Sequence, residues 1–328
     1  MAISPILDHV TILVSHVFLN DPPLSLREVF NLTSAGRQGD GQTERVLAHF
    51  EDGTYLEFIA FRPDIDPEAR RKHRYGECEE GTVVDWAIRF TPPEAPPEPN
   101  DESWEEVFDA MQLRVRDSGT GVIYLEPVRV STRMPDGTES ADVVSFPDHG
   151  GHLEWKRELD VIPGEVPYWV LRSRPGEEQQ QRSPPTAEAH DTRHPSGAAG
   201  LAGVEVRIRA VPERVRSEHR LGLLWETFQT LFGGEPADVV DEGRRIDAWE
   251  WRVGVPVRAN PALRQRLIRL VAPEHMVKNV EVRVDLLRGE GEVARLELDA
   301  SKSPLQIRLG PQTPPEGHRQ NYQWAWMK

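Results

Sequence analysis

The chain contains a single cysteine, Cys78, among its 328 residues. One thiol cannot form a disulfide within the chain, and it excludes a metal centre built from several thiolates. No apolar run approaches the roughly 20 residues that a membrane-spanning helix needs. The N-terminus has no basic region leading into an apolar stretch. We therefore expect a cytoplasmic protein with no membrane partner.

Basic residues are also scarce relative to acidic ones. The sequence has 39 Lys and Arg against 54 Asp and Glu, a formal net charge of −15, and the surplus falls in the first 200 residues. Such a surface repels phosphate backbones, so nucleic acid is not an expected partner. No glycine motif for nucleotide phosphates, nucleophile elbow or serine triad is present either, and we expect no nucleotide cofactor.

Two short segments combine the pattern of a buried strand with one chemically active residue each. Residues 6–14 (ILDHVTILV) carry His9, and residues 54–61 (TYLEFIAF) carry Glu57. Burying a lone imidazole or carboxylate costs several kcal/mol unless the group is paired or binds a cation. We predict that the two strands lie side by side with His9 facing Glu57.

The order strand, helix, loop, strand, strand runs through residues 1–65 and recurs in residues 80–160. Repeats of this kind are copies of one supersecondary unit that pair to share a core. In the first unit, residues 34–43 are predicted to be a glycine-rich loop. The second unit is predicted to contain a strand at 82–90, a helix at 103–116, strands at 122–130 and 141–146, and a closing segment at 151–155.

The two units together define a first domain at residues 1–172. Residues 173–200 are rich in proline and polar residues and are predicted to be a linker, with His190 and His194 in solvent. A third round begins in residues 201–328. It is predicted to contain strands at 202–210, 246–253, 267–272, 280–286, 293–298 and 305–309, and a helix at 213–232. No helix separates the last three strands, so a fourth round would be incomplete.

These patterns favour an α+β fold in which paired βαβββ modules form cupped mixed sheets. The alternative, a doubly wound parallel sheet, would need a long helix between successive strands, and the chain lacks such helices. A further related module would follow at the C-terminus.

Four segments, LDHVTILV, GRQGDGQTE, FEDGTYLEFIAF and RHPSGAAGLAGVEV, resemble the glyoxalase-like domain family of the vicinal-oxygen-chelate (VOC) superfamily. The resemblance covers residues 5–160 well and 193–272 loosely. It implies a cup that holds one metal ion between the first and last strand of each module. Carried over by position, the implied ligands are His9, Glu57, Asp85 and Glu154.

This ligand set departs from that of better-known relatives, because it has one imidazole and three carboxylates. Such an oxygen-rich set favours Mg²⁺ or Mn²⁺ over Zn²⁺. Three carboxylates leave excess negative charge, so one of them could stay protonated as an acid or make no bond to metal. Arg45 stands where the family usually has asparagine. In the third module, Gly203 and either Ile268 or Arg269 take the ligand positions, which indicates a structural module that covers the cup or supports a homodimer.

Each candidate also has a plain structural interpretation. His9 could be a core histidine bonded to Asp8, and Glu57 could be paired with Arg37 or Arg45. Asp85 could lie on an edge strand, and Glu154 could be solvated. The predicted substrate contacts are Arg37, Gln38 and Trp86. The predicted catalytic residues are Glu57, Glu154 and His152, the last of which flanks a flexible glycine turn.

The resemblance implies a small-molecule enzyme, a lyase or isomerase that acts on a carbonyl- or enol-containing metabolite. A bound divalent ion would polarise the substrate oxygen. A first rival is a metal-free enzyme that uses His9 and Glu57 as an acid–base pair. A second is a protein that sequesters a small ligand without catalysis, and a third is a scaffold whose site has decayed.

Overall fold

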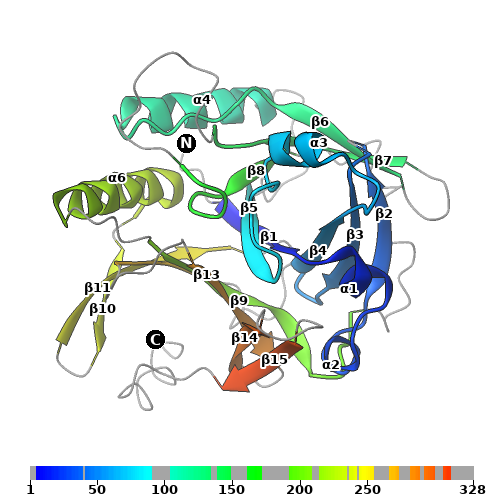
Figure 1. Cartoon of the computed structure of the whole chain (residues 1–328). Coiled ribbons are helices and arrows are strands. Elements are labelled where there is room, and N and C mark those ends of the chain that lie inside the picture. The colour runs from blue at the N-terminus through cyan, green and yellow to red at the C-terminus, as the bar shows by residue number, and fades with distance from the viewer. Residues whose placement is uncertain are drawn as a thin grey trace, which may run out of the picture.

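Two bodies of β-structure make up the protein, a barrel and an open sheet (Figure 1). A computed structural model describes residues 5–39, 41–90, 104–133, 139–148, 161–171, 192–208, 214–234, 236–241, 244–254, 266–272, 281–288, 292–299 and 306–311. No helix among these residues is both long enough and apolar enough to span a bilayer.

Eight strands close the barrel in the spatial order β1-β4-β3-β2-β6-β7-β8-β5. They are β1 (Pro5–Leu13), β2 (Thr33–Gln38), β3 (Thr43–His49), β4 (Tyr55–Phe61), β5 (Thr82–Phe90), β6 (Val128–Arg133), β7 (Glu139–Ser145) and β8 (Tyr168–Leu171). The helices of this part are α1 (His16–Asn20), α2 (Leu24–Arg27), α3 (Pro67–Lys72) and α4 (Trp104–Asp117).

The barrel consists of two modules with the same strand order. In each, the first strand pairs in parallel with the last, β1 with β4 and β5 with β8. The modules join through antiparallel pairs, β1 with β5 and β2 with β6. The predicted α+β fold of paired βαβββ modules is therefore confirmed.

Seven strands form the second sheet, in the order β10-β11-β12-β9-β13-β14-β15. They are β9 (Ala198–Arg207), β10 (Ala237–Asp241), β11 (Arg244–Val253), β12 (Arg266–Val271), β13 (Glu281–Arg288), β14 (Val293–Asp299) and β15 (Gln306–Pro311), and α6 (Arg214–Phe232) follows β9. The first four of these strands repeat the module order, with β9 parallel to β12. The strand β13 does not begin a complete fourth module. In a module the first strand pairs in parallel with the last, whereas β13 pairs with β14 in the antiparallel sense.

An aromatic layer joins the barrel to the second sheet. Phe228 of α6 packs between Trp86 of β5 and Trp251 of β11, with ring centroids 6.1 Å and 5.5 Å apart. The helices α4 and α6 lie side by side along this layer (Figure 1). Burial of such large rings is a major contribution to the core, and here it fixes one sheet against the other.

A buried ion pair also ties the two bodies together. Asp52, in the turn before β4, binds Arg266 of β12 at 2.5 Å. The other oxygen of Asp52 accepts a hydrogen bond from the hydroxyl of Thr54, which in turn accepts one from the backbone N–H of Leu201. Gly200 is required here, because a Cβ atom at this position would lie 2.0 Å from an Asp52 oxygen.

One segment that was predicted to be a loop contains a strand instead. The supposed loop at 34–43 contains most of β2, which pairs with β3 and β6. Pairing on both of its edges thus overrides the low strand propensity of its glycine. The segment predicted to close the second unit, 151–155, lies outside the described residues. The strand beside β5 is β8, which the sequence did not indicate.

His194 was expected in solvent, and this is wrong. Its Nδ1 atom accepts a hydrogen bond from the backbone N–H of Asn31 at 3.0 Å, and its Nε2 atom donates to the His49 carbonyl at 2.9 Å. The rings of Phe30 and Phe50 meet it edge-on. Burial lowers the pKa of His194 to about 4, although the hydrogen bond to the His49 carbonyl opposes this shift.

This buried histidine makes stability depend on pH. The unfolded chain takes up the His194 proton near pH 6.5 and the folded protein only near 4. The free energy of unfolding should therefore fall by about 2 kcal/mol as the pH drops through this window. Urea unfolding of wild type and His194→Gln at pH 7 and pH 4.5 measures the difference. His219→Gln changes an exposed histidine of α6 and should keep the pH dependence of wild type. If His194→Gln shows the same pH dependence as wild type, His194 is not its source.

Candidate functional site

A cavity of about 400 Å³ opens inside the barrel. Pockets of this size suit a small molecule. Its lining residues, drawn from both modules, are His9, Gly39, Arg45, Tyr55, Glu57, His73, Arg74, Tyr75, Arg129, Val130, Ser131, Asp142, Val144, Phe146, Tyr168 and Val170.

His9 lies at the centre of a chain of three hydrogen-bonded side chains. The pairing of β1 with β5 shifts register between Leu7 and His9, which is the signature of a β-bulge. Next to this bulge, the Nδ1 atom of His9 lies 2.9 Å from a carboxylate oxygen of Asp8. An ionised carboxylate only accepts, so Nδ1 donates to it. The Nε2 atom then accepts from the hydroxyl of Tyr168, 2.5 Å away.

Neighbouring side chains also restrict the positions of Asp8 and His9. Tyr55 stacks on the His9 ring with centroids 4.4 Å apart. Arg89 forms an ion pair of 3.2 Å with the second oxygen of Asp8. Because both Asp8 and His9 are buried, this packing holds the imidazole in one orientation. Both His9 and Tyr168 line the cavity.

Glu57 is an ionised carboxylate next to this chain. Its two oxygens accept hydrogen bonds from Arg45 at 2.8 Å and from Thr11 at 2.9 Å, and one lies 3.9 Å from Nε2 of His9. Burial by itself would raise the pKa of Glu57, but the charge of Arg45 and the hydrogen bonds from Arg45 and Thr11 outweigh burial and hold it below the ordinary value. Glu57 therefore supplies fixed negative charge rather than a proton.

Tyr168 takes, in the second module, the place that Glu57 takes in the first. Glu57 pairs with Thr11, two residues after His9, and Tyr168 pairs with Ala87, two residues after Asp85. Burial raises the pKa of Tyr168 well above 10, and the neighbouring charge of Glu57 raises it further. The side chain is therefore a neutral phenol that can donate a hydrogen bond.

Asp85 is separated from the cavity by two residues that line it. Its Oδ2 atom binds Arg74 and accepts from the hydroxyl of Tyr75 at 2.9 Å. Its Oδ1 atom accepts from the Trp86 backbone N–H at 3.0 Å. The carboxylate is fully buried and satisfied by these partners.

The described donor groups do not fit a divalent ion. Glu57 and Asp85 each form an ion pair with an arginine, and the unprotonated nitrogen of His9 accepts a hydrogen bond from the Tyr168 hydroxyl. A cation would have to displace these partners. No cluster of three potential ligands occurs in the described part of the chain. Glu154, predicted as a ligand, lies outside the described residues.

The remaining predicted residues are spread over the barrel. Arg37 pairs with Glu44 at 2.9 Å and is 59% exposed, outside the cavity lining. Gln38 pairs with Thr132 through the backbone. Trp86 is buried in the aromatic layer and donates its indole N–H to the carbonyl of residue 164. His152, like Glu154, lies outside the described residues.

The sequence predicted that His9 and Glu57 lie together, but it did not indicate several other cavity residues. Among these are Tyr168, Arg74 and Tyr75. The signal for Tyr168 was the apolar run at 168–171 (YWVL), which has the length of a strand. Arg74 and Tyr75 follow a short helix and carry no local pattern, so only the tertiary structure shows them.

A family model described as a glyoxalase-like domain matches residues 7–221. The chain belongs to this family, within the VOC superfamily. Among curated proteins no sequence matches the chain. Among solved structures it is similar to a hypothetical protein from Staphylococcus aureus, with a TM-score of 0.50, 10% identity, and coverage of 89% of this chain and 98% of that chain. At this identity the similarity concerns the fold alone.

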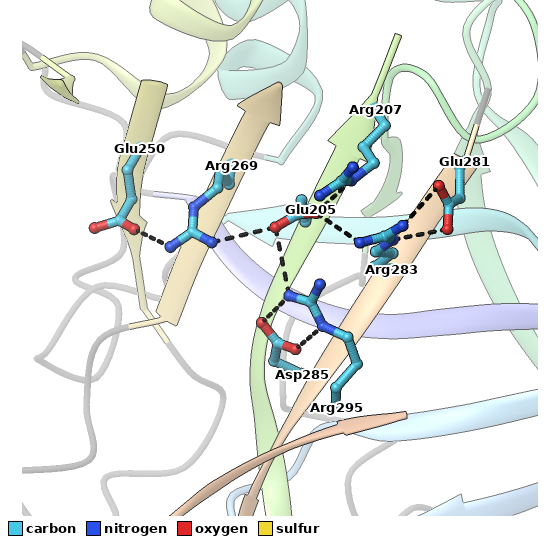
Figure 2. A network of polar contacts seen from close by, with 8 residues as sticks. All are labelled: Glu205, Arg207, Glu250, Arg269, Glu281, Arg283, Asp285 and Arg295. Carbon is cyan, nitrogen blue, oxygen red and sulfur yellow. Dashed lines mark hydrogen bonds and ion pairs between the residues drawn. The ribbon is translucent and has the colours of Figure 1, made fainter. Parts of the chain in front are cut away.

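The third module, which follows the barrel, has a network of ion pairs at the positions that form the candidate site in the barrel. In β9 and β12, Gly203 and Arg269 stand at the positions of His9 and Glu57, since Arg269 pairs with Glu205, two residues after Gly203. Figure 2 shows Glu205 at the centre of the network. Its arginine neighbours, with their distances, are Arg207 at 2.7 Å, Arg269 at 3.2 Å, Arg295 at 3.4 Å and Arg283 at 3.9 Å.

Three of these arginines also bind a second carboxylate, so the charges balance. The pairs are Arg269 with Glu250, Arg283 with Glu281, and Arg295 with Asp285.

Burial alone would raise the pKa of Glu205, but Arg295, Arg207 and Arg269 outweigh burial and lower it to about 2. The stabilisation is therefore complete above about pH 4.5 and is lost as the pH falls toward 2.

Removing the central carboxylate should destabilise the second sheet. Glu205→Gln leaves several half-buried guanidinium groups without their shared partner, and we expect a loss of about 3 kcal/mol in the free energy of unfolding. Chemical denaturation at pH 7 measures it. Glu281 lies at the edge of the same network, and its side chain is 44% exposed. Glu281→Gln should therefore lower the free energy of unfolding by less than about 1 kcal/mol. Equal losses in the two variants would show that Glu205 is not the centre of the network.

Proposed function

We propose that this protein is a small-molecule enzyme, a lyase or isomerase, that moves a proton through Tyr168 and His9, with Asp8 orienting His9, without a metal ion. The observation that carries the proposal is the continuous chain of hydrogen bonds from buried Asp8 to the Tyr168 hydroxyl at the cavity. An imidazole oriented by a carboxylate on one side is a standard arrangement for a general base.

The proton would pass through Tyr168. As the Tyr168 oxygen accepts a proton from a carbon next to a carbonyl group, its own proton moves to Nε2 of His9. The raised pKa of Tyr168 disfavours a free phenolate, so the two transfers occur together. Return of the proton to a neighbouring carbon gives isomerisation, and its delivery to a leaving group gives elimination.

Two carboxylates stabilise the charge that appears on His9. Asp8 contacts Nδ1, and Glu57 lies 3.9 Å from Nε2. Both are buried, so their fields are weakly screened and their positions need no rearrangement during the reaction. Arg45 and Thr11 hold Glu57 in place and keep it ionised.

A sequestering protein is the second candidate. It is supported by the aromatic groups that line the cavity, Tyr55, Phe146 and Tyr168. In that case the Asp8–His9 contact would serve only to satisfy buried polar groups.

Exchange of substrate hydrogen with solvent separates the two candidates. Wild type in D₂O should incorporate deuterium next to the carbonyl of a member of a panel of small carbonyl compounds, followed by NMR. Tyr168→Phe and His9→Gln should slow this exchange about a hundredfold or more, since each breaks the relay. Tyr124→Phe removes a buried hydroxyl outside the cavity and is the matched control. Ligand binding without exchange in wild type would favour the sequestering protein.

Removal of metal provides an independent check. Exchange should be unchanged after dialysis against a chelator, because arginines already occupy the Glu57 and Asp85 carboxylates. The same NMR assay measures it. A loss of exchange that Mg²⁺ or Mn²⁺ restores would contradict the relay and support a site that includes Glu154.

A further inference from the structure

Arg74 is held rigidly at the cavity wall. Its Nη2 atom binds the buried carboxylate of Asp85. Its guanidinium carbon lies 3.5 Å from the ring centroid of Phe146 and 4.8 Å from that of Tyr75. Stacking on aromatic faces together with an ion pair fixes the plane of the guanidinium group.

Two nitrogen atoms of this guanidinium group remain without an acceptor among the described residues. The Nε and Nη1 atoms of Arg74 are buried, and no side chain or backbone group of the described residues accepts a hydrogen bond from them. Buried donors are nearly always paired, because an unpaired one loses its hydration without compensation. A group lining a ligand-sized cavity with donors left over is suited to bind the acceptor oxygens of a ligand.

The position of Arg74 relates these donors to the proton relay. Its guanidinium carbon lies 5.4 Å from the ring centroid of Tyr168. The guanidinium group of Arg74 and the ring of Tyr168 are therefore neighbours on the cavity wall. A compact ligand can contact both groups at once.

We propose that Arg74 binds the carboxylate of the substrate, which is a small carboxylic acid with a carbonyl or hydroxyl group on the adjacent carbon. A carboxylate is favoured because hydrogen bonds between two charged groups are about twice as strong as neutral ones. The reaction assigned to this acid rests on the proposed relay, whereas its binding by Arg74 does not.

Calorimetric titration with pyruvate and with pyruvamide, its neutral analogue, tests the assignment. Wild type should bind pyruvate more tightly than pyruvamide or inorganic phosphate. Arg74→Lys keeps the positive charge beside Asp85 but loses the guanidinium donors, so pyruvate should bind at least tenfold more weakly. Arg71→Gln removes an exposed charge from α3 nearby and should bind pyruvate as wild type does.

Thermal unfolding of each variant shows whether it is folded. Arg74→Lys is preferred to Arg74→Gln, because the latter leaves Asp85 buried without a cation. Equal pyruvate affinity in Arg74→Lys and Arg71→Gln would overturn the proposal. So would pyruvamide or phosphate binding as tightly as pyruvate, or no pyruvate binding by wild type.

The outcomes also separate this inference from the proposed function. If pyruvate binds through Arg74 but no carboxylic acid undergoes deuterium exchange, the relay fails and the binding site stands. If exchange occurs on neutral carbonyl compounds and is unaffected in Arg74→Lys, the relay stands and this inference fails.

Discussion

The pairing of buried carboxylates with arginines is the constraint on which the site depends. A carboxylate inside a barrel loses its hydration, and a cation must satisfy it or the group becomes protonated. The barrel meets this requirement with the pairs Asp8–Arg89, Glu57–Arg45 and Asp85–Arg74. These arginines fix the charges and occupy oxygens that a metal ion would need. The chemistry that remains is that of the imidazole and the phenol between them.

The two modules of the barrel contribute unequally to this chemistry although their topology is the same. Register places His9 and Glu57 in one module and Asp85 and Tyr168 at the corresponding positions of the other. The third module repeats the strand order but fills its face with the charge-balanced network around Glu205 (Figure 2). One module fold therefore supports a cavity between two copies and an ion network in a third, because function follows from side chains and not from topology.

Prediction from sequence succeeded where the pattern was local and failed where partners were distant. The strands around His9 and Glu57 were predicted from their apolar runs, and their proximity follows from parallel pairing of first and last strands. The strand at 33–38 was missed, because its glycine favours a loop and its second partner, β6, lies far along the chain. His194 was assigned to solvent, because a polar segment gives no sign that its end docks against Phe30 and Phe50.

The sequence by itself determined that a unit of strands and one helix repeats, the class of fold and the closeness of His9 to Glu57. Periodicity and strand length are local properties, so they can be read along the chain. Only the tertiary structure decided that Tyr168 completes the chain from Asp8, that Arg74 faces the cavity, and that arginines hold the carboxylates. Such contacts join residues far apart in the chain, and their geometry depends on register and barrel closure, which no local pattern specifies.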